Sequence, residues 1–307
     1  MKGKILLVGG ATATGKTAFA VEMAQRLNGE VISADCMLVY RDMDIGTAKP
    51  TEKEMCGIPH YMIDIVSPDQ PFSVGDYEDR ALPICEDILA RGKVPIVCGG
   101  TGFYMQALLF LRSNGNVGAD PELRRRYEEL AAREGNAALF ARLAAVDPKS
   151  AATLHPNDVK RVIRALEIFE RTGKRKSEQN DGFCPRFPYL AVQFDYPRDV
   201  LYERIGLRVD CMISAGLIDE VRALLASGVP ESAQSMQGIG YKEVLSFLNG
   251  AYLQSTMSDM IKMNTRHYAK RQITYFKKFP GMLHLDPRER SNAEKVTEMF
   301  YDDTRTS

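Results

Sequence analysis

Residues 10–17 read Gly-Ala-Thr-Ala-Thr-Gly-Lys-Thr and fit the pattern G-x-x-x-x-G-K-[ST] of a phosphate-binding loop. An apolar run, Ile5–Val8, precedes this loop, and apolar residues recur at helical spacing from Lys16 onward. A loop between a strand and a helix points its backbone N–H groups and the helix N-terminus at phosphate oxygens. The chain is therefore predicted to bind a di- or triphosphate, with Lys16 adding a positive charge and the Thr17 hydroxyl available to Mg²⁺.

Apolar runs alternate with helical patterns along the chain, which predicts an α/β fold with a parallel sheet like that of phosphate-loop NTPases. The expected strands are Lys4–Val8, Val31–Ala34, Tyr61–Ile65, Val94–Cys98, Tyr189–Phe194 and Met282–Leu285. Ligands of such sheets bind beyond the carboxyl ends of the strands. Because Asp35 and the turn Gly99–Gly102 directly follow two of these strands, we expect both to lie beside the phosphate-binding loop.

The chain of 307 residues is long enough for one large domain with an insertion. Residues 116–187 are predicted to form a helical insertion, with helices over 121–145 and 157–171, and residues 1–115 and 188–307 to form a discontinuous core. From Arg198 to Gly250 the pattern is helical, with breaks at Gly216 and at Gly228–Pro230.

Forty basic residues balance forty acidic ones, so any polyanion must be bound by a local patch rather than by net charge. The six cysteines lack C-x-x-C or metal-ligand spacing, which favours free thiols in a reducing compartment. The sequence shows neither a signal peptide nor an apolar stretch of the roughly 18 residues that a membrane span needs. We expect a cytoplasmic protein with no membrane partner, and a monomer.

Two basic clusters stand out against this neutral background. Residues 160–176 hold seven basic and two acidic residues, and residues 262–278 hold six Lys or Arg and no acid. In the second cluster Lys262, Arg266, Lys270 and Lys277 fall on one helical face, opposite an apolar face. A charged helix face is often merely solvated, but two such clusters together favour binding of a polyanion.

Two polar residues beyond the strand ends have several possible roles. Asp35 is suited to act as a helix cap, as a carboxylate near Mg²⁺ or as a general base, and its predicted place across from Lys16 and Thr17 favours catalysis. Thr101 is suited both to cap the helix expected over 103–111 and to orient a phosphate or a nucleophile.

Residues 33–50, which contain Ser-Ala-Asp-Cys-Met-Leu-Val-Tyr-Arg and Met-Asp-Ile-Gly-Thr-Ala-Lys-Pro, resemble the tRNA dimethylallyltransferase (tRNA isopentenyltransferase) family. The resemblance continues through Gly57–His60, Phe72–Tyr77, Gly99–Tyr104, His155–Glu167, Arg208–Asp210, Gly238–Glu243 and Thr265–Gln272. It extends nearly from end to end and is much more specific than the phosphate-binding loop alone.

The resemblance implies transfer of a dimethylallyl group from dimethylallyl diphosphate to the exocyclic amine of an adenosine in tRNA. That adenosine is 3′-adjacent to the anticodon in tRNAs that read codons beginning with U, and diphosphate is released. The catalytic residues would be Asp35 as proton acceptor, Thr101, Lys16 and Arg208, with Mg²⁺ at Thr17. The diphosphate would be held by Gly10, Ala11, Thr12, Ala13, Thr14, Gly15, Lys16 and Thr17. The anticodon stem-loop would be bound by Asp35, Cys36, Met37, Leu38, Thr101, Arg124, Lys160, Arg161, Arg164, Gln237, Arg266 and Lys270.

The chain departs from the family pattern beside the expected catalytic aspartate. Cys36-Met37-Leu38 stands where Ser-Met-Gln or Ser-Arg-Gln is usual. The family's Gln is expected to hydrogen-bond a nucleobase, and the loss of that contact at Leu38 weakens base discrimination by about 1–3 kcal/mol. Two alternative functions are considered besides that of a transferase. One is a small-molecule kinase with a phosphate-binding loop, and the other is an RNA-binding protein whose active site has lost its activity.

Overall fold

The computed structural model describes residues 3–111, 118–178 and 184–302, which form two compact units. Unit 1 comprises Met1–Leu109 and Pro185–Ser307, and unit 2 comprises Phe110–Cys184. The insertion expected over 116–187 thus corresponds to a unit that starts and ends a few residues earlier, and the expected boundary at 115 lies outside the described residues.

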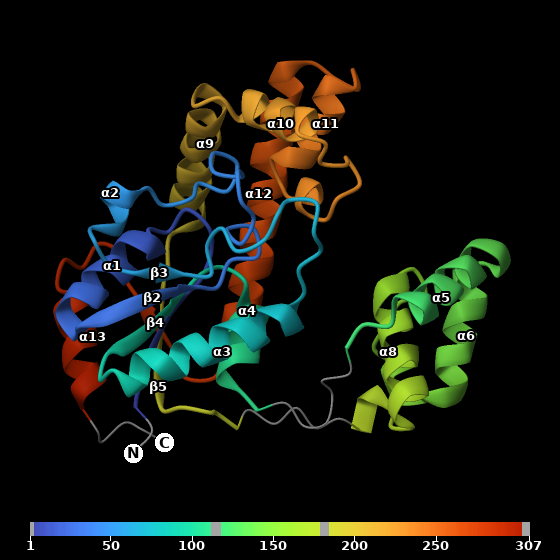
Figure 1. Ribbon diagram of the computed structural model, residues 1–307, viewed down its shortest axis with the longest axis horizontal. Coiled ribbons are helices and arrows are strands. Elements are labelled where there is room, and N and C mark those ends of the chain that lie inside the picture. The colour runs from blue at the N-terminus through green and yellow to red at the C-terminus, as the bar shows by residue number, and fades with distance from the viewer. Residues whose placement is uncertain (1–2, 112–117, 179–183, 303–307) are drawn as a thin grey trace. The chain divides into compact units, whose positions relative to one another are not determined.

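Unit 1 is built on six parallel strands in the order β3-β2-β4-β1-β5-β6, which confirms the predicted α/β class (Figure 1). The strands are β1 (Ile5–Gly9), β2 (Gly29–Ser33), β3 (His60–Tyr61), β4 (Val94–Cys98), β5 (Tyr189–Phe194) and β6 (Met282–Leu285). The strand expected over 61–65 was wrong in extent. It stops at Tyr61 because Met62 and Asp64 take positive φ angles of 64° and 56°, which an extended strand excludes.

Helices cover both faces of the sheet. In Figure 1, α1 (Lys16–Leu27) and α13 (Asn292–Tyr301) lie on one side, with α3 (Val74–Ala90) and α4 (Gly102–Leu109) on the other. Phe19, Met23, Val296 and Phe300 are buried against strand residues in the first of these layers. Burial on both sides explains why β1, Ile5–Gly9, is a continuous apolar run.

The remaining described helices of unit 1 come from the segments that follow β2 and β5 in the chain. They are α2 (Glu52–Met55), α9 (Arg198–Ser214), α10 (Leu217–Ala226), α11 (Tyr241–Leu248) and α12 (Gln254–Phe276), with a 3₁₀ turn over Ser235–Gln237. The predicted break at Gly216 is confirmed: the residue has φ 103° and separates α9 from α10. Ala11 of the phosphate-binding loop packs on Leu201 and Ile205 of α9 and Ala269 of α12, so these two helices back the loop.

Unit 2 is a small helical bundle with its own core. Its helices are α5 (Pro121–Glu134), α6 (Asn136–Val146), α7 (Pro148–Ala151) and α8 (Val159–Thr172), followed by a 3₁₀ turn over Lys176–Glu178. The single helix expected over 121–145 is interrupted at Gly135, whose φ of 86° ends α5 and begins α6. Leu139, Leu143 and Val162 are fully buried in the core of this unit. Within the described part of the chain, no helix is both long and apolar enough to cross a bilayer.

Candidate functional site

The phosphate-binding loop leaves β1 and turns into α1 at Gly15, whose φ of 86° is accessible to glycine at little cost. Lys16 and Thr17 are the first residues of α1, so their side chains and backbone N–H groups lie at the positive end of the helix. The loop is braced internally, because the Ala11 carbonyl accepts hydrogen bonds from the Thr14 hydroxyl and from the Lys16 ammonium group. The Thr12 N–H points elsewhere, donating to Gln272 Oε1 at 2.9 Å.

A cavity of about 620 Å³ opens over this loop. It is lined by residues 13–18 of the loop and α1, by Ala48, Pro50 and Glu54, and by Arg204, Leu207 and Arg208 of α9. The Arg204 Nε donates to the Ala13 carbonyl at 2.7 Å, which ties α9 to the loop. We call this space the phosphate cavity because cations and helix-end N–H groups surround it.

Burial shifts the pKa values of the two central cations of this region. Desolvation lowers the pKa of Lys16 to about 8, and the nearby Arg208 guanidinium acts in the same direction. Desolvation also lowers the pKa of Arg208 from its ordinary value, against the opposing effect of Asp35. A buried cation without a full counter-charge is poised to gain from an anionic ligand, since the ligand replaces the water that the cation has lost.

Asp35 and Thr101 meet beyond the ends of β2 and β4, as predicted from their places after two strands. The Thr101 hydroxyl oxygen accepts a hydrogen bond from the Cys36 N–H at 3.0 Å, and Asp35 Oδ1 accepts one from the Met37 N–H at 2.9 Å. Asp35 therefore caps the turn that follows it, and no described residue donates a hydrogen bond to its other oxygen, Oδ2. Burial, followed by the Asp35 charge, raises the pKa of the Cys36 thiol to about 11, so this thiol stays protonated.

A second cavity of about 320 Å³, the acceptor cavity, contains Asp35, Cys36 and Met37 in its wall. Thr12, Gln237 and Tyr268 line it as well, with apolar contributions from Val209, Met212, Ile239 and Ile261. Leu38 is not among its lining residues; its backbone carbonyl accepts the Asp64 N–H instead. Arg208 lines both cavities, so it borders the phosphate-binding loop in one and Asp35 in the other.

The loop Asp44–Lys49 forms part of both walls and is held by two residues that the sequence did not single out. The Glu220 carboxylate of α10 accepts the backbone N–H groups of Asp44, Ile45 and Gly46 at 2.7–3.0 Å. Tyr241, only 1% exposed, packs against this loop from α11. Helical periodicity predicts that a residue lies on a buried face, but it does not predict which backbone N–H groups will donate hydrogen bonds to a carboxylate such as that of Glu220.

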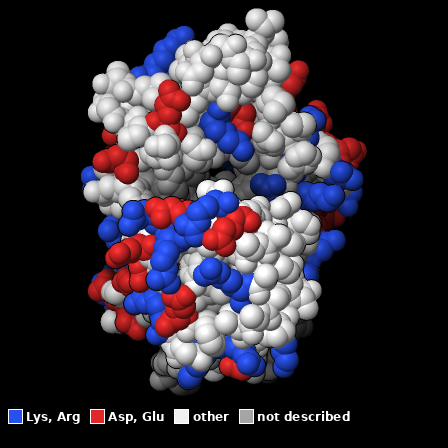
Figure 2. All heavy atoms as spheres, turned by 90° about the vertical axis from the view of Figure 1, so that its right-hand side faces the viewer, with Lys and Arg blue, Asp and Glu red and all other residues white. Residues whose placement is uncertain are grey.

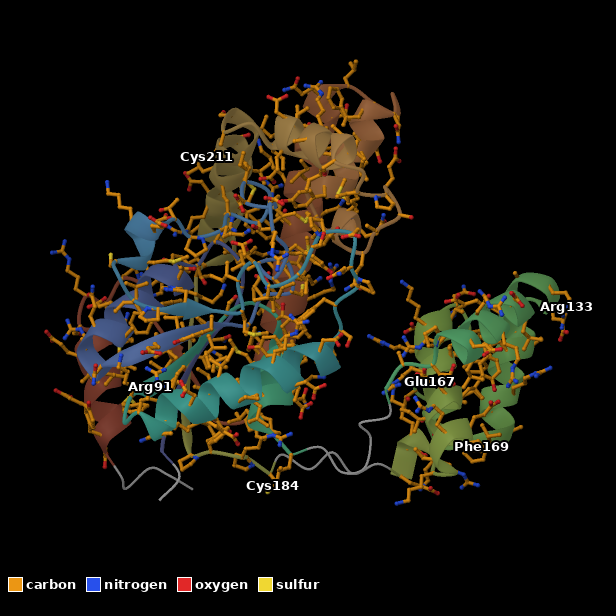
Figure 3. All side chains as sticks on the ribbon, viewed as in Figure 1. Arg91, Arg133, Glu167, Phe169, Cys184 and Cys211 are labelled. Atoms are coloured by element: carbon orange, nitrogen blue, oxygen red, sulfur yellow. The ribbon has the colours of Figure 1, made fainter. Side chains whose placement is uncertain are left out.

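Arg124 and Arg164, two of the basic residues predicted to bind tRNA in unit 2, are engaged within the unit. Glu167 of α8 is fully buried and accepts hydrogen bonds from Arg124 Nε at 2.9 Å, from Arg164 at 2.5 Å and from the Asp120 N–H at 2.8 Å. Figure 3 shows Glu167 among the helices of unit 2, whereas Arg133 points outward at the end of α5. Arg124 and Arg164 retain side-chain exposures of 39% and 32%, so their outer atoms are accessible.

Ion pairs also interrupt the rest of this charge cluster. Arg161 pairs with Asp158 at 3.2 Å, while Lys160 is exposed. On the face seen in Figure 2, Lys and Arg side chains alternate with Asp and Glu instead of forming one uniform basic sheet. A counted excess of basic residues thus overstates the field that this surface offers to a polyanion.

The basic face predicted for α12 is only partly free, because α9 packs against its N-terminal half. Lys262 is half-buried and pairs with Asp210 of α9 at 2.6 Å, and the Arg266 guanidinium lies 5.3 Å from the centre of the Tyr202 ring, also on α9. The packing of α9 against α12 accounts for both contacts. Lys270 of α12 remains exposed, as do Lys277 and Lys278 just after its end, so the exposed charge gathers toward the C-terminal end of the helix.

A divalent metal ion at this site would take few ligands from the protein. The described residues contain no cluster of three or more His, Cys, Asp or Glu side chains that could hold a metal ion. The exposed Thr17 hydroxyl at the start of α1 borders the phosphate cavity. One hydroxyl fits Mg²⁺, which keeps several waters and takes its other ligands from bound phosphates.

Comparison with known proteins identifies relatives over almost the whole chain. A family model described as IPP transferase matches residues 38–279, and one described as isopentenyl transferase matches residues 3–68. A tRNA dimethylallyltransferase of Acetivibrio thermocellus is 43% identical over 295 residues, 95% of this chain and 94% of that relative. The crystal structure of the full-length tRNA isopentenylpyrophosphate transferase of Bacillus halodurans is 42% identical with a TM-score of 0.72, covering 97% of this chain and 95% of that one. A eukaryotic dimethylallyltransferase, described in crystallographic snapshots as acting on tRNA, is 31% identical with a TM-score of 0.82 and covers 97% of this chain and 77% of its own.

Proposed function

Because this chain belongs to the IPP transferase family, we propose that it transfers a dimethylallyl group from dimethylallyl diphosphate to tRNA. The acceptor is the exocyclic amine of the adenosine 3′-adjacent to the anticodon, in tRNAs that read codons beginning with U. The observation that carries the proposal is the pair of cavities that share Arg208. A diphosphate site and a carboxylate site that meet at one guanidinium match a reaction in which an allylic carbon passes from one to the other.

The phosphate cavity suits a diphosphate leaving group. When the allylic C–O bond breaks, negative charge develops on the departing diphosphate, and Lys16, Arg208 and the N-terminus of α1 are placed to stabilise it. These groups are fixed by the loop and by α9 before the substrate arrives, so they need little rearrangement during the reaction. The proposed reaction consumes no ATP, because the diphosphate that leaves comes from dimethylallyl diphosphate.

The acceptor cavity suits an adenine that has left its stack. Enzymes that modify a base commonly take it out of the helix or loop and surround it with apolar and hydrogen-bonding groups. As the amine nitrogen bonds to the allylic carbon, one of its protons passes to Asp35, whose Oδ2 faces no described donor. Thr101 orients this segment through its hydrogen bond to the Cys36 N–H.

Mg²⁺ is the cofactor we propose, held by Thr17 and by the diphosphate itself. When bound, it neutralises charge on the leaving group. The family's usual amide at position 38 is replaced here by Leu38, which lies outside the acceptor cavity, so we propose that base selection depends on Gln237 and on backbone groups of the cavity wall.

The test is an incubation of the purified protein with radiolabelled dimethylallyl diphosphate, Mg²⁺ and an unmodified tRNA that carries adenosines beside its anticodon. We expect label in the anticodon loop and release of one diphosphate for each group transferred. Phosphorylation of a small molecule from ATP without any requirement for RNA would support a kinase instead. Retained tRNA binding without label would support an RNA-binding protein with an inactive site.

A further inference from the structure

We propose that Gln272 is a positioning residue that fixes the phosphate-binding loop and the Thr101 turn relative to each other. This inference rests on the proposed transferase function and deepens it. Gln272 lies on α12, and its side chain occupies the space between the two segments that follow β1 and β4. Gln272 takes none of the catalytic roles that are assigned to Lys16, Asp35 and Arg208.

The Gln272 amide uses both of its ends. Its Oε1 accepts the Thr12 N–H at 2.9 Å, and its Nε2 donates to the Gly100 carbonyl at 2.9 Å. The residue is only 5% exposed, and its hydrogen bond to the Gly100 carbonyl is buried, so that carbonyl cannot exchange its partner for bulk water without local opening. A side-chain amide carries a hydrogen-bond donor and a hydrogen-bond acceptor side by side and has no charge. It is therefore suited to bridge a backbone N–H and a backbone carbonyl.

The backbone at Gly100 is shaped around this amide. A Cβ added to Gly100 would lie 2.1 Å from Gln272 Nε2, whereas its distance to the Gly10 carbonyl oxygen would be an ordinary 3.6 Å. Gly100 does not take a positive φ, so the glycine is required by the close approach of Gln272 and not by backbone conformation. The pair Gly100–Gln272 thus forms one packing unit.

A displacement of the Gly100–Gln272 pair would move the residues that border both cavities. Thr101 follows Gly100 directly, and its hydroxyl holds the Cys36 N–H beside Asp35. On the other side, Thr12 belongs to the loop that bears Lys16. Gln272 therefore sets the spacing between the proton acceptor and the diphosphate site, and an error of about 1 Å in such a spacing costs about 100-fold in rate.

A double-mutant cycle tests this role. The proteins are the wild type, Gln272→Ala, Gly100→Ala and the double variant, with Gln254→Ala as a control because Gln254 is exposed at the start of the same helix. The kinetic constants for both substrates, the tRNA Kd and the thermal midpoint are measured for each. We expect Gln272→Ala to lower kcat about ten- to 100-fold while the tRNA Kd changes less than about threefold, since the residue is buried and lines neither cavity.

The sharpest result concerns Gly100→Ala. Alone, it should lower kcat about as much as Gln272→Ala, because the added methyl group displaces the Gln272 amide from its position between Thr12 and Gly100. In the double variant the clash is gone, so kcat should be no lower than in Gln272→Ala alone. This non-additivity would not arise from two independent structural defects.

Two outcomes would overturn the inference: wild-type kcat in Gln272→Ala, or losses that multiply in the double variant. If Gln272→Ala does not fold, Gln272→Met, which keeps the length of the side chain but neither hydrogen bond, must show the loss of kcat at an unchanged tRNA Kd. Absence of transfer by the wild type would instead refute the proposed function, so the two failures are distinguishable.

Discussion

The Glu220 carboxylate accepts a hydrogen bond from the buried Tyr241 hydroxyl at 2.7 Å. The same carboxylate receives the N–H groups of residues 44–46, and a Cβ on Gly46 would lie only 2.5 Å from the Tyr241 ring. The next residue, Thr47, accepts a hydrogen bond from Arg208 at 3.1 Å through its carbonyl. Glu220 thereby positions the guanidinium that both cavities share, although it touches neither cavity.

Replacement of Glu220 by Ala is expected to lower the transfer rate by about tenfold. The change leaves the N–H groups of residues 44–46 and the buried Tyr241 hydroxyl without this acceptor, at about 1–3 kcal/mol for each group that water cannot reach. The loop then relaxes and Arg208 loses its orientation. Steady-state kinetics with dimethylallyl diphosphate measure the effect, and Asp219→Ala, at an exposed neighbour on the same helix, is the control. Equal rates for both variants would contradict the role assigned to Glu220.

Asp35→Ala should abolish transfer and leave tRNA affinity largely intact. Removal of a positioned proton acceptor typically lowers a rate by about 10²–10⁴. Asp35→Asn is the more conservative variant, because its amide oxygen can still accept the Met37 N–H at the Asp35 Oδ1 position. Single-turnover rates and a filter-binding Kd for tRNA separate chemistry from binding. Wild-type turnover in Asp35→Asn would remove Asp35 from the proton transfer.

Thr17→Ala should raise the Mg²⁺ concentration that gives half-maximal activity by about tenfold, because a hydroxyl ligand is lost. Thr17→Ser keeps the hydroxyl and should titrate with Mg²⁺ like the wild type. Chelation of divalent ions should stop transfer by all three proteins, with activity restored by added Mg²⁺. An unchanged Mg²⁺ titration of Thr17→Ala would show that the metal ion is held elsewhere.

Glu167 should make unit 2 sensitive to acid. Burial alone would raise the pKa of Glu167, but hydrogen bonds from Arg124, the Asp120 backbone and Arg164 outweigh it and lower the pKa to about 2. Because this value lies below that of the unfolded chain, at about 4.3, the stabilisation is complete above about pH 5 and is lost as the pH falls toward 2.

Glu167→Gln should therefore destabilise the protein by about 2 kcal/mol near neutral pH and flatten the acid dependence of unfolding. The expected loss is below the 3–5 kcal/mol typical of a broken buried ion pair, since both guanidinium groups reach solvent. Denaturant unfolding followed by circular dichroism at several pH values measures it. Glu129→Gln is the matched control, because Glu129 is an exposed residue paired with Arg125. A loss that persists unchanged at pH 2 would contradict the linkage.

The sequence predicted the parallel sheet and the gathering of Asp35, Thr101 and Lys16 at one edge of it, for a physical reason. Parallel strands buried on both faces are continuous apolar runs, and their carboxyl ends gather on one edge, so Asp35, Thr101 and Lys16 could be placed together from order alone. The predicted extent of the strand over 61–65 was wrong because Met62 and Asp64 take positive φ values; Asp tolerates that conformation, but Met gives no sign of it in the sequence.

Pairwise partners were not predictable in the same way. Periodicity places Gln272 in line with Ala269 and Phe276 on the buried face of α12, and an uncharged polar residue at that position, within a segment that resembles the family, was the available signal. Its partners are backbone groups about 170 and 260 residues away, which no local pattern encodes. The same holds for Arg124 and Arg164, where counting charges could not distinguish a free guanidinium from one bound to a buried carboxylate.

The position of unit 2 in the chain has a consequence for biosynthesis. Strand β1 pairs with both β4 and β5, yet Phe110–Cys184 lie between β4 and β5 in sequence. On the ribosome, β3, β2, β4 and β1 are therefore complete while β1 still has an open edge, and the helices of unit 2, whose contacts are local, can fold first. An unpaired edge of a buried parallel strand readily pairs with other chains. The nascent chain therefore carries this open edge until the whole insertion has been translated and β5 can pair with β1.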